Sequence, residues 1–155
     1  MENRRDLLAP LAPLAPLLGE WVADAETPIG QAQCARSFTP ALGGAYVELV
    51  ARWDFGPGHN AYEERALFGA SAAGALAFWS FTSDGGQATG EIADVSDIHP
   101  SALGFVAAMP AGLARQAYWP ATDGSLQWVV EAKTPRGWER LASHCYRRSA
   151  TTSLL

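Results

Sequence analysis

Apolar and polar residues alternate along most of the chain after residue 18. In the segment 45–55 every second residue, from Ala45 to Phe55, is apolar, and the segment 125–132 repeats the pattern from Leu126 to Ala132. An alternation with a period of two places the apolar side chains on one face of a β-strand. The pattern therefore predicts half-buried antiparallel strands, each with one face toward a core.

Clusters of Gly, Pro, Asn and Asp, such as 56–60 and 84–86, separate these segments and are typical of tight turns. Short turns connect antiparallel neighbours, because a parallel pair needs a long crossover. A sheet of many strands hides its edges by closing into a barrel or by stacking as a sandwich. We expect ten strands, near residues 19–26, 31–39, 45–55, 61–69, 75–82, 87–93, 103–109, 113–119, 125–132 and 138–148.

The N-terminal segment places two adjacent arginines before a run rich in Leu and Ala, as a secretory signal peptide does. However, proline at every third position from 10 to 16 would interrupt a helical apolar core, and two acidic residues dilute the positive charge. A cut after Ala25 would also remove Trp21, which we expect to belong to the fold. We therefore expect residues 1–17 to form a helical or polyproline-like lid docked through its leucines, and the protein to be cytoplasmic.

The last expected strand differs from the others because neither of its faces is apolar. A simple alternation places on one face Trp138, Arg140, Ala142, His144, Tyr146 and Arg148. The opposite face carries Glu139, Leu141, Ser143, Cys145 and Arg147. Such a strand lies at a rim or faces a wet cavity, and it is the first indication of a ligand pocket.

Four short motifs occur in an order that resembles a known group of proteins. They are Leu-x-Pro-Leu-x-Gly-x-Trp at 14–21, Gly-Gly-x-Tyr at 43–46, an aromatic strand ending in Asp-Gly at 76–85, and Tyr-x-Arg at 146–148. Together they resemble small bacterial lipocalin-like proteins of the DUF1579 type, which are related to nitrobindin and to the calycin barrels of fatty-acid-binding proteins.

The resemblance implies an all-β fold, a single antiparallel up-and-down β-barrel of about ten strands with a short N-terminal helical segment. The barrel would span residues 18–148, and residues 149–155 would form a disordered tail. Its function would be to bind a small, largely apolar molecule in the barrel cavity, unless large side chains fill the barrel. The alternative implied by the nitrobindin relationship is a haem protein that acts on nitrogen oxides.

Three residues are expected to build the closed base of this barrel. The Trp21 ring would plug the end, and its indole N–H would require an acceptor. Gly19 would allow the backbone to approach closely beneath the ring. An arginine from the last strand, Arg148 or Arg147, would lie over the indole as a cation–π partner.

The candidate ligand-binding residues are polar groups on otherwise aromatic strands together with the tryptophans that would line the barrel. They are His144, Tyr146, Arg36, Arg65, Trp53, Trp79 and Trp128. In fatty-acid-binding proteins the last strand carries an Arg-x-Tyr pair for a carboxylate, whereas this chain has His144 in the similar place, which weakens a bidentate carboxylate site. His144 would instead be the axial ligand if haem binds; a hydrogen-bonded structural histidine is the other interpretation.

Composition excludes several classes of function. With a formal net charge of -5, the chain has no basic surface for nucleic acid, and its apolar runs are too short for a transmembrane helix. We expect no metal site, no catalytic residues and more generally no enzyme, because phosphate-binding loops, dinucleotide fingerprints and zinc motifs are missing. The adjacent Glu63 and Glu64 would point to opposite faces of a strand, so they cannot act as one dyad. We expect Cys34 and Cys145 to be reduced thiols, and a homodimer remains open.

Overall fold

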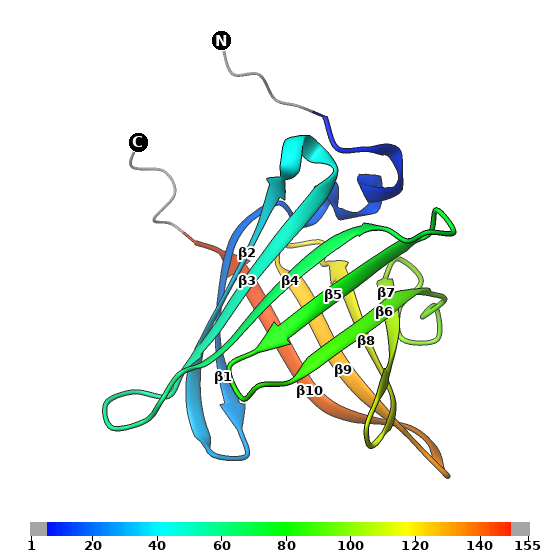
Figure 1. The fold of residues 1–155 in the computed structure, drawn as a ribbon. Helices are drawn as coiled ribbons and strands as arrows, with labels where there is room; N and C mark the ends of the chain where they lie inside the picture. Colours follow the sequence, from blue (N-terminus) through cyan, green and yellow to red (C-terminus); the bar gives the residue numbers. More distant parts are fainter. Residues whose placement is uncertain (1–5, 150–155) are drawn as a thin grey trace.

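The computed structural model describes residues 6–149, which form a closed antiparallel β-barrel (Figure 1). A 3-10 helix, η1, spans Ala9–Leu17, and a short second one, η2, spans Leu42–Gly44. The strands are β1 (Gly19–Thr27), β2 (Gly30–Ala41), β3 (Tyr46–Asp54), β4 (Tyr62–Ala70), β5 (Leu76–Thr82), β6 (Gln87–Ala93), β7 (Leu103–Met109), β8 (Gly112–Pro120), β9 (Leu126–Thr134) and β10 (Gly137–Arg148). The predicted ten-stranded up-and-down barrel with a short N-terminal helical segment is therefore confirmed.

Each strand pairs with its neighbour in sequence, and β10 returns to β1 to close the barrel. The closing junction is short, since only Trp21–Arg148 and Val22–Arg147 are register partners there. Beyond it, the backbone N–H of Ser149 donates to the carbonyl of Glu20 at 2.9 Å. Residues 150–155 of the expected tail and residues 1–5 of the expected lid lie outside the described residues.

Helix η1 covers the end of the barrel that lies away from the β5–β6 and β7–β8 turns (Figure 1). Its leucines recur every third residue, which matches the three residues per turn of a 3-10 helix, so Leu11, Leu14 and Leu17 are all buried. The prolines between them stay toward solvent without breaking an α-helical ladder. The N-terminal segment therefore closes one end of the barrel while the opposite end remains open. No helix in the described part of the chain is long and apolar enough to cross a membrane.

An aromatic cluster fills the half of the barrel next to η1. The rings of Phe68 and Phe105 have centroids 5.2 Å apart, and Phe78 meets Phe105 edge-on at 5.6 Å. Phe38 meets Tyr118 in a second edge-on contact at 5.6 Å. Edge-on aromatic pairs contribute stability beyond the apolar area they bury. These rings therefore form a packed floor below the open half of the barrel.

Strand β10 corrects the expectation that Trp138 and Arg140 share a face with His144 and Tyr146. The register with β9 shifts between Arg140 and Ala142, which marks a β-bulge at Leu141. A bulge inserts one residue, so the alternation inverts across it. Ala142, His144 and Tyr146 point into the barrel, whereas Trp138 and Arg140 lie on its outer surface, where Arg140 contacts Glu131 and Trp138 lies against Arg115.

The connection between β6 and β7 packs on the outside of the barrel. Val95 forms a small buried cluster with Ala117 and Val129 on the outer face of β8 and β9. Next to it, Arg115 donates to Asp97 at 2.7 Å and to Glu131 at 2.6 Å. We call Asp97, Arg115, Glu131 and Arg140 the outer clasp, because its ion pairs tie this connection to the sheet.

Candidate functional site

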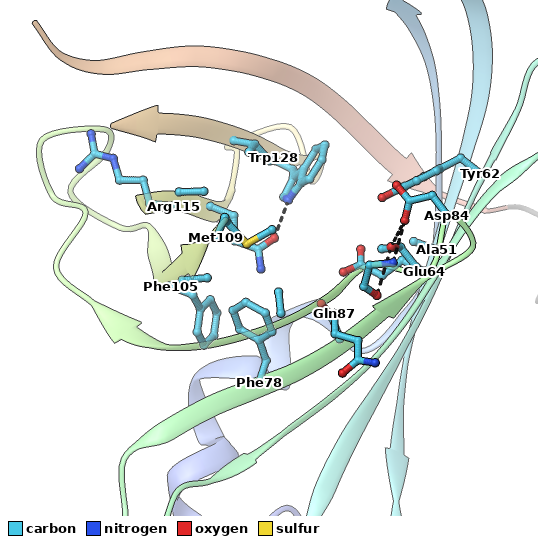
Figure 2. A pocket seen from close by; sticks show the side chains of 18 of the residues that line it. Ala51, Tyr62, Glu64, Phe78, Asp84, Gln87, Phe105, Met109, Arg115 and Trp128 are labelled. Atoms are coloured by element: carbon cyan, nitrogen blue, oxygen red, sulfur yellow. Dashed lines mark hydrogen bonds between the residues drawn. The ribbon is translucent and has the colours of Figure 1, made fainter. Parts of the chain in front are cut away.

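The open half of the barrel contains a cavity of about 400 Å³. Its wall is mostly apolar and aromatic, with Phe78 and Phe105 on one side and Trp128 across from Tyr62, Glu64 and Asp84 (Figure 2). The β5–β6 turn and the β7–β8 turn form its rim, at Asp84–Gln87 and Met109–Pro110. The size and the lining both fit a small-molecule site, since such pockets enclose roughly 300–1,000 Å³ and are largely apolar.

Arg36 carries the positive charge of this cavity. It extends from β2, is only 2% exposed, and lines the cavity wall. Its Nε donates to the Tyr146 hydroxyl at 3.2 Å and its Nη1 donates to the Tyr118 hydroxyl at 2.9 Å. The guanidinium lies over the Trp128 ring, 4.0 Å from its centre. These contacts fix the guanidinium in place.

Arg36 remains charged despite its burial. Burial acts to lower the pKa of Arg36, but Tyr118, Tyr146 and Glu64 together raise that pKa above its ordinary value. Both hydrogen-bond partners are neutral phenols, and no carboxylate within the described residues lies within ion-pair distance of it. The deep wall of the cavity therefore presents a fixed, incompletely paired cation.

His144 lies behind this wall, at 4% exposure, between two tryptophan rings. Its ring centroid is 4.9 Å from that of Trp128 and 5.2 Å from that of Trp53. Its Nδ1 is 3.0 Å from the Tyr146 hydroxyl. Burial and, secondly, the charge of Arg36 lower the pKa of His144 to about 4, so the imidazole is neutral at pH 7.

The environment of His144 does not fit an axial haem ligand. The histidine is not part of the cavity wall, and indole rings flank it on two sides. Since a guanidinium can only donate, the Tyr146 hydroxyl accepts from Arg36, and the same hydroxyl occupies Nδ1 of His144 at 3.0 Å. The cavity therefore does not present His144 to a haem, and we derive no haem chemistry for this site.

The opposite wall of the cavity is acidic. Tyr62 and Glu64 extend inward from β4, and Asp84 stands at the rim beside them (Figure 2). Hydrogen bonds from the Thr82 hydroxyl and the Gly86 backbone lower the pKa of Asp84, so this carboxylate is ionised at neutral pH. The side-chain carboxylate of Glu64 has no hydrogen-bond or ion-pair partner among residues 6–149. The cavity thus has a cation on one wall and carboxylates on the other.

Five of the seven predicted ligand-binding residues lie together inside the barrel. Arg36, Trp53 and Trp128 line the cavity, and His144 and Tyr146 lie directly behind Arg36. Whether any of them binds a ligand stays a prediction.

The predicted inward orientation of Arg65 and Trp79 is wrong. Arg65 is exposed, and Trp79 lies over an open hollow on the outer surface with Val106 and Leu113. The register explains both, because Ala66–Ser80 and Phe68–Phe78 are inward pairs of β4 and β5, so the alternate pairs Arg65–Phe81 and Leu67–Trp79 point outward. The expectation that Glu63 and Glu64 face opposite ways agrees with the structure, in which Glu63 pairs with Arg52 on the outside.

Several cavity residues were not among the predicted ligand-binding residues. They are Tyr62, Glu64, Phe78, Ser80, Phe105 and Gln116. A signal for the β4 members existed, because Tyr62, Glu64, Ala66 and Phe68 form one alternating set that ends on a fully buried ring. No comparable signal marks Gln116, whose Oε1 accepts a hydrogen bond from the Trp128 indole at 3.2 Å.

The expected base of the barrel is present at the closed end. Trp21 is 3% exposed, and its Nε1 donates to the carbonyl of Leu17 at 2.8 Å. Arg148, not Arg147, lies over its ring at 4.2 Å from the centre. Both cysteines are free: Cys34 is buried beside Tyr146, and Cys145 is exposed on the other face of β10.

Comparison with known proteins adds no family to this description. No protein-family model matches the chain, and no curated protein matches it significantly. Within the described residues, no group of three or more His, Cys, Asp or Glu side chains could hold a metal ion. The class defined by the fold and the site is a closed ten-stranded antiparallel barrel that encloses a mostly apolar cavity.

Proposed function

We propose that this protein binds a small, largely apolar molecule in its barrel cavity, as a calycin-like carrier or sensor. The observation that carries the proposal is the cavity of about 400 Å³, lined by Trp53, Phe78, Phe105 and Trp128 and open at one end. An apolar space of this size inside an otherwise well-packed core costs stability, since each missing contact is a loss. A ligand that fills it restores those contacts.

The construction of the barrel supports a binding role over a structural one. Helix η1 and Trp21 close one end, so a molecule has a single approach, past the β5–β6 and β7–β8 turns. The wall is rigid because every strand pairs on both sides. A preformed site of this kind loses little conformational entropy on binding.

A neutral fluorescent probe, N-phenyl-1-naphthylamine, tests the proposal. We expect saturable binding at one site, with increased and blue-shifted emission as the probe enters the cavity. Leucine in place of Ala88 or Ala114 adds volume to the cavity wall and should weaken binding by about tenfold, a loss of roughly 1.4 kcal/mol.

The matched control is Ala35→Leu, the same substitution at an exposed position of β2. It should leave the affinity unchanged. Absence of binding up to the solubility limit of the probe, or equal affinity in the cavity variants and the control, would contradict the proposal.

A further inference from the structure

The charges inside the cavity are unusual for a site that takes a purely apolar molecule. Burying a charged side chain is costly unless a partner of opposite charge compensates it. Arg36 is almost completely buried and lies over the Trp128 ring, yet its hydrogen bonds go to two neutral phenols and the described residues give its Nη2 no acceptor. This nitrogen belongs to a residue of the cavity wall, so a ligand is in position to supply the missing acceptor.

Glu64 presents the opposite charge to the same space. Its position on β4 and that of Arg36 on β2 are both paired with Ala51 of β3, so the two side chains start two strands apart on the inner face of the barrel. They do not form an ion pair with each other. Arg36 instead crosses the interior toward Tyr118, Tyr146 and Trp128, which leaves cavity space between the two charges.

The surroundings of Glu64 favour a cation. Asp84 adds a second carboxylate at the rim, and the rings of Trp53 and Tyr62 stand beside it with centroids 5.7 Å apart. Carboxylates together with aromatic faces are the groups that bind ammonium ions in water-poor sites. Among residues 6–149, Arg115 is the one other basic residue at the cavity, and it is held by Asp97 and Glu131 of the outer clasp.

From this arrangement we propose that the ligand carries two polar ends on an apolar, preferably aromatic body: an acidic or other acceptor group that Arg36 binds, and a protonated amine that Glu64 binds. The inference rests on the proposed binding function and narrows its ligand to amphoteric molecules. Arg36 acts at the deep wall, and Glu64 and Asp84 act toward the mouth. An acid lacking the amine leaves Glu64 unpaired, and an amine lacking the acid leaves Arg36 unpaired.

A matched series of para-substituted benzenes tests both ends separately. The probes are 4-(aminomethyl)benzoic acid, its longer homologue 4-(2-aminoethyl)benzoic acid, 4-methylbenzoic acid, 4-methylbenzylamine and p-xylene. Their affinities at pH 7 are measured by calorimetry and by displacement of N-phenyl-1-naphthylamine. We expect at least one of the amino acids to bind about tenfold more tightly than either singly charged probe, the effect of one charge-assisted hydrogen bond.

Glu64→Gln isolates the amine end, because it keeps the side-chain shape and removes the charge. It should abolish the advantage of the amine-bearing probes and leave 4-methylbenzoic acid within about threefold of its original affinity. Glu63→Gln is the control, since its carboxylate lies on the outer face and pairs with Arg52. The acid end is tested on the unmodified protein by comparing 4-methylbenzoic acid with p-xylene, so no Arg36 variant has to fold.

The outcomes separate this inference from the proposed function. If none of the probes binds, neutral or charged, the cavity is not a ligand site and both proposals fail. If the neutral probes bind but the amine gives no advantage, or Glu64→Gln and Glu63→Gln act alike, the amphoteric ligand is overturned while the binding function stands.

Discussion

The guanidinium of Arg148 lies over the indole of Trp21, 4.2 Å from its centre, and the two residues are register partners where β10 meets β1. Nη1 of Arg148 also donates to the carbonyl of Leu18 at 2.8 Å, while Trp21 donates to the carbonyl of Leu17. One pair of side chains therefore joins the closure of the barrel to the end of helix η1.

Replacing Arg148 by Met should destabilise the protein by about 1 kcal/mol. The substitution keeps most of the aliphatic stem but removes the cation–π contact, which contributes about 0.5–1 kcal/mol at an exposed site, and the hydrogen bond to Leu18. Urea unfolding followed by tryptophan fluorescence measures the loss. Arg147→Met, at the exposed neighbouring position, is the control and should change stability much less.

Gly19→Ala should cost more than Gly30→Ala. Both glycines have a positive φ, +121° and +123°, so both substitutions carry the same backbone strain of about 1 kcal/mol or more. A Cβ at Gly19 would lie 2.5 Å from Nη1 of Arg148, whereas a Cβ at Gly30 meets nothing within 4 Å. The added methyl group at Gly19 therefore displaces Arg148 from the indole.

The excess cost at Gly19 should shrink in an Arg148→Met background, where the displaced contact is already missing. The comparison requires the unfolding free energies of Gly19→Ala and Gly30→Ala, each measured alone and combined with Arg148→Met. Equal costs for Gly19→Ala and Gly30→Ala in the original protein would show that the close approach of Arg148 does not matter.

The sequence was sufficient to predict the positions of the strands, because the turn residues and the period-two alternation agree along the chain. It was insufficient for the faces of β4 and β5. Residues 76–81 are apolar or small on both faces, so alternation alone does not say whether Phe78 or Trp79 points inward. The choice is made by the pairing of Phe68 with Phe78, which depends on the register between strands and not on either strand alone.

The bulge at Leu141 limited the prediction of the candidate site in the same way. His144 and Tyr146 follow the bulge and face inward as expected, but Trp138 and Arg140 precede it and face outward. No Gly or Pro marks the position. The mixed polarity of β10 thus has two causes. After the bulge, His144 and Tyr146 belong to the polar cluster around Arg36 inside the barrel, and before it Arg140 belongs to the outer clasp.

Glu131→Gln should destabilise the protein by about 3 kcal/mol. Glu131 is buried and accepts hydrogen bonds from Arg115 at 2.6 Å and from Arg140 at 2.9 Å, so the amide leaves Arg115 short of a buried charge partner. Chemical denaturation at pH 7 measures the effect. The exposed pair of Arg52 and Glu63 provides the control, because Glu63→Gln should cost less than about 1 kcal/mol.

The same clasp should weaken in acid. Burial alone would raise the pKa of Glu131, but the hydrogen bonds from Arg115 and Arg140 outweigh it and hold the pKa below its ordinary 4.5. A carboxyl whose pKa is lowered by folding contributes stability above its unfolded pKa and loses it as the pH falls through the folded value. The stability of the unmodified protein should therefore fall more steeply below pH 4.5 than that of Glu131→Gln. If the curves of stability against pH are parallel for the two proteins, Glu131 does not contribute to the loss of stability in acid.

His144 should produce a separate loss of stability on acidification, which begins at a higher pH than the loss caused by Glu131. Burial and the charge of Arg36 lower its pKa from 6.5 to about 4 in the folded protein, so the unfolded chain takes up a proton first as the pH falls. Stability is complete above pH 6.5 and declines from there toward pH 4, by roughly 2–3 kcal/mol in total. Unfolding free energies measured between pH 7 and pH 4.5 should show this slope in the unmodified protein and not in His144→Gln. His59→Gln, at an exposed turn, controls for removing a histidine, and a slope that survives in His144→Gln would assign the titration to another group.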